Sequence, residues 1–426
     1  MNPTRRDFIK TTAAGAGVAA IAARSMRNIM GANDRIKVGI IGVGGMGTSH
    51  LNRMLEDKDA LNIEIAAVCD VYTRRMKKAR EACGGDGYMD YRELLNQKDI
   101  DAVFVVTPDH WHSKISIEAM EAGKHVYCEK PMTLTVEQAF EMKEAVKKYK
   151  KAFQVGPGRT GDARFWKAGE IIRAGDVGKV TWAQGGYNRN IKDGAFNAWF
   201  PIDETAGPSK SGDDYINWDM WLGSEWDLAP RIDWNPEHFF RFRKYWPYNG
   251  GVATDLLYHI LAPLLISIVG ANGVCPRKVN ANGGLYVMKD GRDIPDVFIM
   301  NVDYNEEFTI TLTSILTNDT PVPIRIYGQY GTIDFLGQNE MLLTGNGDYV
   351  EEFRQKHGGY NKVSPNVVPR MDMHENFFSV IREGGQLNCN VELGTSTMVA
   401  IKMAVESYKR NKTMLWDAEK QQITSA

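Results

Sequence analysis

Cysteine is scarce in this sequence. Its 426 residues include five cysteines, at positions 69, 83, 128, 275 and 389, and no two of them form a CxxC pair. The odd number and the wide spacing argue against a disulfide framework and against a zinc knuckle. Cys69 and Cys128 fall inside apolar, strand-like runs, so we expect them to be small buried hydrophobic residues.

The sequence also lacks an excess of charge of either sign and long apolar runs. Lysine and arginine number 51, against 53 aspartate and glutamate residues, for a formal net charge of -2. This balance argues against nucleic acid as a partner, because a phosphate backbone requires basic residues. No later segment approaches the ~20 apolar residues of a membrane-spanning helix, so we expect no stable membrane insertion after processing. The length predicts two domains and a tail.

The N-terminus resembles a twin-arginine export signal. Residues 4–10 read TRRDFIK, an apolar run rich in alanine and glycine follows, and Ala20-Ile21-Ala22 offers a small-residue cleavage site. The alternative is a basic N-terminus before a short alanine-rich helix. We expect residues 1–33 to be a signal peptide and linker, and the protein to be periplasmic or otherwise exported by the twin-arginine machinery.

A glycine-rich motif follows the first predicted strand. The apolar, β-branched run 35–41 leads into Gly42, Gly44 and Gly47, and residues 46–57 are predicted to be helical. A strand, GxGxxG spacing and a helix together indicate a dinucleotide-binding site, with the pyrophosphate at the helix N-terminus. Met46 lies within this motif and is predicted to contact the cofactor.

The second predicted strand favours NAD as the cofactor. It ends in Asp70, which lies about 20 residues beyond the glycines, where an acid binds the ribose 2′-hydroxyl of NAD. Arg74 and Arg75 follow and are able to bind the 2′-phosphate of NADP instead, so NADP remains an alternative. Their other interpretation is solvated charge at the start of a helix.

Further strands and helices alternate after this point. The apolar strand within 101–108 ends in Thr107 and Pro108, the next helix carries His112, and the strand from 125 ends in Glu129 and Lys130. Alternation of this kind predicts a doubly wound parallel sheet with ligands at the carboxyl ends of its strands. The His110-x-His112 spacing lacks a third ligand, and we predict no metal site.

Five ordered motifs resemble the glucose-fructose oxidoreductase, inositol dehydrogenase and rhizopine-catabolism family (Gfo/Idh/MocA). They are GVGGMG, VVTPDHWH, CEKPM, QVGPGR and GGVATDLLYH, and they cover residues 35 to 260. The resemblance implies an α/β protein: a Rossmann domain, here 34–155, and a second domain, here 156–426. That second domain is built on a large open, mainly antiparallel sheet, whose outer face often makes the contact of a dimer or tetramer.

The rest of the chain fits this plan. Strand-like runs separated by Gly, Asn and Asp turns recur within 179–187, 278–287, 296–304, 308–316, 322–328 and 331–336. Two helical stretches, at 374–384 and 395–412, close the chain.

The resemblance also implies the catalytic residues. The lysine of the EKP motif is Lys130, which would hydrogen-bond the reacting sugar oxygen beside the nicotinamide. Asp255 and His259 are four residues apart and so share one face of a helix; the histidine is the implied general acid/base. The place three residues after His259, where many sugar dehydrogenases of the family have a further aspartate, holds Ala262.

Aromatic residues are concentrated between positions 166 and 248. Eight of the ten tryptophans lie there, together with polar neighbours that suit a sugar pocket. Most of these aromatic residues are expected to pack in the core. The candidates for contact with the substrate are Arg159, Tyr187, Trp246 and Tyr258.

Three functions are compatible with these residues. The first is an NAD(P)-dependent oxidoreductase that moves hydride between a ring carbon of a sugar, glycoside or polyol and a tightly bound nicotinamide cofactor. The second is an NAD-dependent glycosidase that oxidises C3 transiently, eliminates the aglycone, adds water and returns the hydride. The third is a non-catalytic sugar-binding protein, which the combination of Lys130, Asp255 and His259 disfavours.

Overall fold

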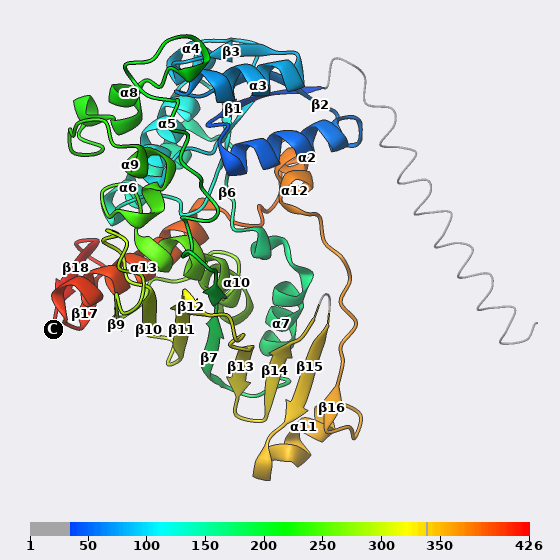
Figure 1. Cartoon of the computed structure of the whole chain (residues 1–426). Coiled ribbons are helices and arrows are strands. Elements are labelled where there is room, and N and C mark those ends of the chain that lie inside the picture. Colours follow the sequence, from blue (N-terminus) through cyan, green and yellow to red (C-terminus); the bar gives the residue numbers. More distant parts are fainter. Residues whose placement is uncertain (1–34, 338–339) are drawn as a thin grey trace, which may run out of the picture.

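The computed structural model describes residues 35–337 and 340–426. The predicted export signal at 1–33 lies outside the described residues. Two large sheets organise the chain, a parallel sheet of six strands and a mixed sheet of ten (Figure 1). The predicted α/β class is therefore confirmed.

The first sheet is parallel throughout, in the order β3-β2-β1-β4-β5-β6. Its strands are β1 (Ile36–Ile41), β2 (Ile63–Cys69), β3 (Asp86–Tyr88), β4 (Ala102–Val105), β5 (His125–Cys128) and β6 (Phe153–Val155). Strands covered on both faces need nearly continuous apolar sequence, and β4 is buried at every residue. The strand order reverses between β1 and β4, which places a crevice at their carboxyl ends, as in a Rossmann domain.

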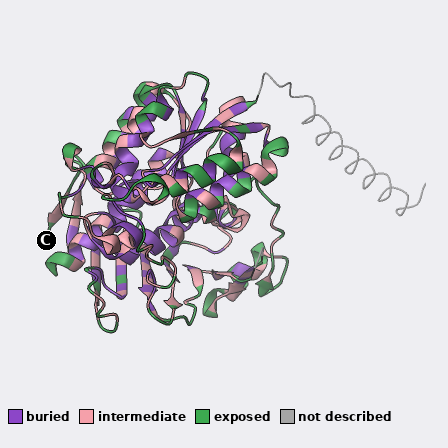
Figure 2. Ribbon diagram, turned by 45° about the horizontal axis from the view of Figure 1, so that its top comes forward, coloured by how far each residue is buried: buried purple, intermediate pink, exposed green. Residues whose placement is uncertain are grey.

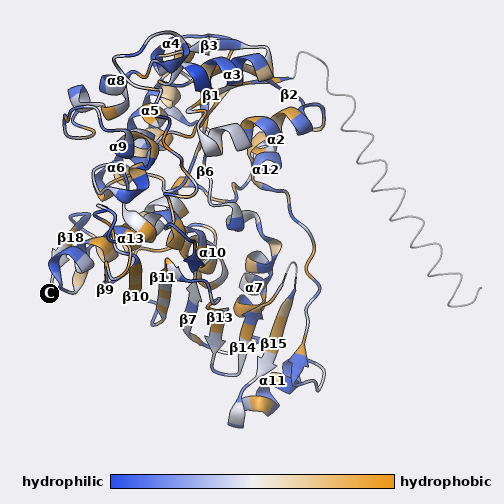
Figure 3. Ribbon diagram, viewed as in Figure 1, coloured by the Kyte–Doolittle hydropathy of each residue, from blue (hydrophilic) through white to orange (hydrophobic). Residues whose placement is uncertain are grey.

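Helices cover this sheet. They are α2 (Gly45–Leu61), α3 (Thr73–Cys83), α4 (Tyr91–Leu95), α5 (Asp109–Glu121) and α6 (Val136–Tyr149). The helix α3 is mostly hydrophilic (Figure 3). At the start of α6, Thr135 and Gln138 form a capping box. The Thr135 hydroxyl accepts a hydrogen bond from the Gln138 amide, and the Gln138 side-chain oxygen accepts one from the Thr135 amide.

The second sheet follows the order β16-β15-β14-β13-β7-β11-β10-β9-β17-β18. Its strands are β7 (Val180–Gly186), β9 (Lys278–Gly284), β10 (Val297–Asp303), β11 (Thr309–Ile315), β13 (Ile324–Gly328), β14 (Gly331–Phe335), β15 (Met341–Gly345), β16 (Lys362–Val363), β17 (Met414–Asp417) and β18 (Gln422–Ser425). All neighbours are antiparallel except β7 and β11, which are parallel. A short ladder joins β8 (Arg189–Asn190) to β12 (Thr317–Asn318).

Three helices, α7 (Ala163–Arg173), α10 (Tyr258–Val269) and α13 (Val391–Arg410), lie on one face of the mixed sheet, toward the parallel-sheet domain (Figure 1). Buried residues run through this layer and through the parallel sheet (Figure 2). Both α13 and α12 (Met373–Glu383) also contact the first domain, α13 through α6 and β6. The last part of the chain therefore returns to the first domain.

The remaining elements are short. They are α8 (Trp218–Leu222), α9 (Pro236–Phe240), α11 (Val350–Lys356), a π-helical turn at Ala253–Leu257, and 3-10 turns at Gly158–Gly161, Gly212–Asp214, Ser224–Trp226, Phe242–Lys244 and Gly347–Tyr349. Within the described residues, no helix combines the length and the apolar character needed to cross a bilayer.

Candidate active site

A cavity opens at the carboxyl ends of the parallel strands, where the strand order reverses. Its walls include Gly42, Asp70, Thr107 and Lys130 from the first domain. The opposite wall comes from residues far along the chain, namely Phe200, Met220, Trp221, Phe239, Phe240, Phe242 and Arg243. We call residues 200–248 the covering segment, because they close the cavity from outside the first domain.

The glycine loop can admit a ligand only because side chains are absent. Gly42 has φ +89°, and a Cβ there would lie 2.6 Å from the Val106 carbonyl oxygen. A Cβ on Gly47 would lie 1.9 Å from the Gly42 carbonyl oxygen, so this glycine permits α2 to pack on the loop. Gly44 and the half-exposed Met46 line the cavity beside the N-terminus of α2, which fits a pyrophosphate.

Asp70 is held in position by backbone groups. Its carboxylate accepts hydrogen bonds from the Val43 and Tyr72 amides, each 2.9 Å long. Burial raises its pKa, and attraction to Arg75 and the two backbone hydrogen bonds oppose this shift. Because each carboxylate oxygen has a further lone pair, Asp70 can still accept donors from a ribose in the cavity that it lines.

The two arginines after Asp70 have different positions. Arg75 lines the cavity, with its guanidinium 5.4 to 5.5 Å from the ring centroids of Phe239 and Phe240. Arg74, which was predicted to contact the cofactor, instead pairs with Asp203 at 2.5 Å and with Asp214, both outside the first domain. Arg74 is therefore not among the residues that line the cavity.

Of the predicted cofactor residues that follow β4, two line the cavity and one lies behind its wall. Thr107 and Pro108 line the cavity, and the Thr107 hydroxyl is buried without a hydrogen-bond partner among the described residues. His112 lies behind this wall, with its ring nitrogens 2.7 Å from the Pro131 carbonyl and 2.8 Å from the Thr107 carbonyl. It therefore fixes the two loops that carry the site. Within the described chain, no group of three or more His, Cys, Asp or Glu side chains is placed to hold a metal ion.

Glu129 is the first residue of a buried series of hydrogen bonds that also includes His50 and His374. One carboxylate oxygen is 2.9 Å from His50 Nε2, and the other accepts the Lys130 backbone N–H at 3.0 Å. His50 Nδ1 is 2.8 Å from Nε2 of His374, which lies on α12. The burial of Glu129 raises its pKa, but the hydrogen bond and charge of His50 outweigh this and lower it overall. The C-terminal region thus supports the loop of Lys130.

Lys130 forms the centre of an ion-pair cluster. Its ammonium donates to Asp255 Oδ1 at 2.9 Å and to the Asp255 carbonyl oxygen at 3.0 Å. Arg243 Nε donates to the same Oδ1 at 3.2 Å. An ammonium has three N–H donors, so Lys130 keeps one for a ligand oxygen.

Asp255 lies in the π-helical turn that precedes α10, and π-helical turns are frequent at functional sites. Burial by itself raises the pKa of its carboxyl. The charges of Lys130 and Arg243 outweigh burial and hold this pKa well below its usual range. Asp255 is therefore a carboxylate that orients Lys130 and does not itself take up the reaction proton.

His259 has ring nitrogens that are available to a ligand. Neither ring nitrogen forms a hydrogen bond with any residue in the described part of the chain. Burial, together with repulsion from Lys130, lowers its pKa to about 3, so the imidazole is neutral at pH 7. Its ring stands edge-on to Tyr187, with 5.9 Å between centroids.

Asp109 is a site residue that the sequence interpretation missed. It lines the cavity at the start of α5 and accepts a hydrogen bond from Asn249 Nδ2 at 2.7 Å. Burial raises its pKa to about 7, against the opposing charges of Arg243 and Lys130. Its place between Pro108 and His110, at the carboxyl end of a strand, was a signal that could have identified it.

The four predicted substrate residues do not gather in one place. Tyr187 and Arg159 lie beside His259, with the Arg159 guanidinium carbon 5.4 Å from the Tyr187 ring centroid. Trp246 packs instead under the Lys409 ammonium, 4.1 Å from its ring centroid.

The prediction for Tyr258 as a substrate contact is wrong. Its side chain is fully buried, and its hydroxyl donates to the Gly394 carbonyl on α13 at 3.3 Å. The physical reason is helical geometry, because consecutive residues point about 100° apart around the axis. When His259 faces the site, its neighbour faces the core.

The covering segment is joined to the first domain by many polar contacts. The Tyr72 hydroxyl donates to Asp203 at 2.7 Å, Lys77 donates to Asp213 at 2.6 Å, and both His110 and Trp111 hydrogen-bond the Trp221 carbonyl. The segment also has an apolar core of its own, formed with Tyr72 by Ala206, Ile216, Trp218, Trp221, Leu222, Ala229, Phe239, Phe240, Tyr245 and Tyr248. A ligand in the cavity is thus enclosed by a folded unit and not by a loose loop.

Comparison with known proteins identifies the first domain. Residues 36–157 match the model of a family described as "Oxidoreductase family, NAD-binding Rossmann fold". This stretch is the parallel-sheet unit described above, which is therefore an NAD-binding Rossmann domain.

Curated relatives are similar over the same part. Inositol 2-dehydrogenase of Salmonella typhimurium is 31% identical over 153 residues, which cover 35% of this chain and 45% of the relative. Alpha-N-acetylgalactosaminidase of Shewanella oneidensis is 33% identical over 126 residues, 27% of each chain. The chain thus spans less than half the length of these relatives.

Solved structures match over both domains. A levoglucosan dehydrogenase in complex with NADH and levoglucosan has a TM-score of 0.63 at 20% identity, covering 89% of this chain and 98% of the other. An NAD-binding protein from Listeria innocua also has a TM-score of 0.63 at 20% identity, covering 89% and 97%. At this identity the match establishes the shared two-domain fold.

Proposed function

We propose that this chain, whose first domain is an NAD-binding Rossmann domain, is a Gfo/Idh/MocA oxidoreductase that acts on a sugar, glycoside or polyol. One observation carries the proposal. Lys130 lines the nucleotide cavity, keeps a free donor and is held by a buried carboxylate, and near it lies a neutral histidine that has no hydrogen-bond partner among the described residues. A binding protein without catalysis has no need for this combination.

The residues divide the chemistry between them. When bound, NAD would accept the hydride from the carbon that carries the reacting hydroxyl. Lys130 donates a hydrogen bond to that oxygen and so stabilises negative charge as the C–H bond breaks. His259 accepts the hydroxyl proton at a ring nitrogen, because its imidazole is neutral. Asp255 keeps Lys130 in position through the 2.9 Å contact.

We propose NAD as the physiological cofactor. Asp70 lies at the cavity, where it suits an unphosphorylated ribose, and Arg74 is occupied by two aspartates. The covering segment supports tight binding, since it supplies one wall of the cavity.

The experiment that tests this function needs no added nucleotide. The protein is purified as folded and mixed with a panel of sugars, polyols and glycosides, while bound nicotinamide absorbance and sugar products are followed together. Lasting reduced nicotinamide with a keto-sugar is the expected result. Purified protein that neither carries nor binds NAD would exclude the proposal.

The alternative is an NAD-dependent glycosidase, in which the hydride returns to the sugar after elimination and addition of water. Two observations favour keeping it. Asp109 gives the site a second group able to exchange protons near neutral pH, and similarity extends to the Shewanella oneidensis glycosidase. In the same experiment this function yields free sugar and aglycone over many turnovers, with only transient reduced nicotinamide.

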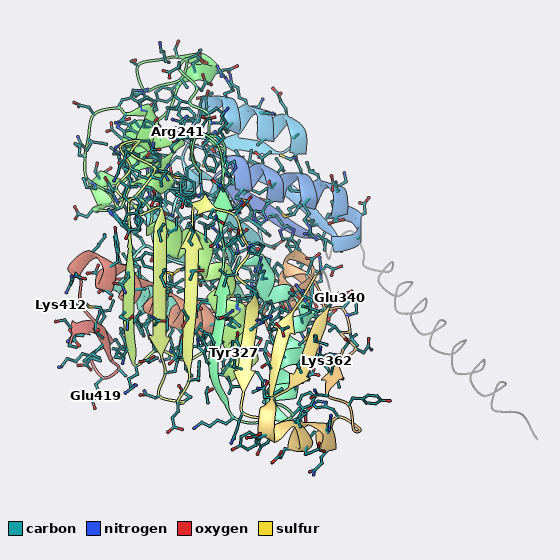
Figure 4. The ribbon with its side chains drawn as sticks, turned by 60° about the horizontal axis from the view of Figure 1, so that its bottom comes forward. Arg241, Tyr327, Glu340, Lys362, Lys412 and Glu419 are labelled. Atoms are coloured by element: carbon teal, nitrogen blue, oxygen red, sulfur yellow. The ribbon has the colours of Figure 1, made fainter. Side chains whose placement is uncertain are left out.

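We further propose that the chain is exported by the twin-arginine machinery and forms a homo-oligomer. The motif TRRDFIK at residues 4–10 supports export. The mixed sheet supports assembly, because the exposed Trp182 on β7 stacks on Tyr327 of β13 with 4.4 Å between ring centroids, and Tyr327 lies on the face of the sheet seen in Figure 4. Replacement of Arg5 and Arg6 by lysine tests export. Light scattering of the purified protein tests assembly.

A further inference from the structure

Two arginines beside the proposed catalytic histidine have no counter-ion in the part of the chain that the structure describes. Within residues 35–337 and 340–426, neither Arg159 nor Arg189 forms an ion pair with a carboxylate. Both guanidinium groups lie over the ring of Tyr187, 5.4 and 4.8 Å from its centroid. Tyr187 in turn contacts His259, so the arginines belong to the substrate side of the site.

The donors of these arginines are only partly used. Arg189 Nη2 donates to the Tyr187 hydroxyl at 2.9 Å, and its guanidinium also stacks on Trp199. Its Nε is buried and has no acceptor among the described residues. The Arg159 guanidinium makes no hydrogen bond with a described residue. Buried donors without partners are rare in folded proteins, so an acceptor from outside the chain is expected.

Three carboxylates of the site already have cationic or histidine partners. Asp162 pairs with Arg164, Glu129 with His50, and Asp255 with Lys130 and Arg243. None of them is within ion-pair distance of Arg159 or Arg189. Since a half-buried cation gains from a counter-ion, a negatively charged ligand would stabilise this cluster.

We propose that the substrate carries an oxyanion, a carboxylate or a phosphate ester, which binds to Arg159 and Arg189. A guanidinium donates two parallel hydrogen bonds to such a group, which also fixes the orientation of the sugar ring. Held in this way, the sugar presents its hydroxyl to His259 and Lys130. This inference rests on the proposed function, because it names the substrate class of the same site.

The test compares binding of matched ligands to NAD-loaded protein by titration calorimetry. Each set contains a neutral methyl glycoside, the same ring with a C6 carboxylate, and the same ring with a C6 phosphate, in the gluco and galacto series. We expect one anionic member to bind about tenfold or more tightly than its neutral parent. The carboxylate and phosphate members identify which oxyanion is bound.

Variants locate the effect. Arg159→Gln and Arg189→Gln should remove most of the anionic preference, whereas Arg159→Lys should keep part of it. Arg92→Ala is the matched control, because Arg92 also lies over an indole ring, 5.4 Å from Trp226, but outside the site. Equal affinity for neutral and anionic members in wild-type protein would overturn the proposal, even where a variant fails to fold.

The outcome is separable from that of the proposed function. Reduction of bound nicotinamide by a neutral sugar, with no preference for the anionic partner, would retain the oxidoreductase and reject the oxyanion site. Failure to bind NAD would reject the oxidoreductase, while sugar-acid binding to the unloaded protein would still report on the two arginines.

Discussion

Lys130 and His259 have separate tasks, and substitution of either should be visible in the rate. Lys130→Met removes the donor to the sugar oxygen, and His259→Ala removes the proton acceptor. We expect each to lower kcat by about 10²-fold or more, because positioned acid–base groups contribute on that scale. Single-turnover reduction of bound nicotinamide measures the step, with thermal unfolding as the control for folding. Near-normal rates in both variants would show that the chemistry lies elsewhere.

His110 should make stability depend on pH. It is fully buried, hydrogen-bonds the Trp221 carbonyl, and burial lowers its pKa to about 4. The unfolded imidazole, with a pKa near 6.5, binds a proton that the folded one refuses, so stability falls as the pH drops from about 6.5 to 4. The loss from this residue is about 3 kcal/mol. Urea unfolding at pH 7, 5.5 and 4 should show a smaller loss in His110→Gln.

The sequence predicted individual site residues where a motif fixes the backbone. Gly42, Gly47 and Asp70 lie as their spacing required, because a glycine-rich turn and a strand end determine their positions locally. Arg243 could not be found in this way. It reaches Asp255 only through the tertiary packing of the covering segment, and no local pattern encodes that contact.

The covering segment should control how long the cofactor stays bound. Arg74 and Lys77 on α3 join it to the first domain through Asp203, Asp214 and Asp213, and neither side chain lines the cavity. The double variant Arg74→Ala/Lys77→Ala should therefore release NAD faster, by about tenfold, since several weak exposed pairs are lost together. Displacement of bound NAD by a fluorescent analogue measures the rate.

Lys37→Ala is the control for that experiment, because it removes a comparable surface pair, with Asp99, far from the covering segment. Equal release from wild-type protein and from both variants would contradict the role given to the segment. An NADP affinity that rises in Asp203→Asn/Asp214→Asn would, in addition, support the view that the two aspartates withhold Arg74 from a 2′-phosphate.

Strands with alternating apolar and polar residues were predicted from the sequence. Strands without this alternation, and units assembled from residues far apart in the sequence, were not. The runs around β7, β9, β10, β11, β13 and β14 were recognised from their alternation. β15 was missed because the apolar residues that begin its sequence, MLLTG, are consecutive and do not alternate with polar ones. The small aromatic core of the covering segment was missed because it joins residues from many turns around Tyr72.

At the scale of the molecule, the first domain depends on the end of the chain. Phe377 on α12 packs on Phe104 and Tyr127 of the parallel sheet, and the Val155 amide donates to the Cys389 carbonyl. A fragment of residues 35–155 would expose this surface, so we expect it to unfold without a cooperative transition. Circular dichroism of the fragment and of the full chain measures this. A cooperative melt with full NAD affinity would show that the domain is autonomous.

The central claim is that hydride moves between a sugar carbon and a nicotinamide held beside Lys130 and His259. The most direct measurement mixes NAD-loaded protein with a ring-deuterated sugar or glycoside and examines the bound nucleotide by mass spectrometry. The account predicts deuterium on the nicotinamide ring in wild-type protein and almost none in Lys130→Met. Turnover of the sugar without any label on the nucleotide would contradict it.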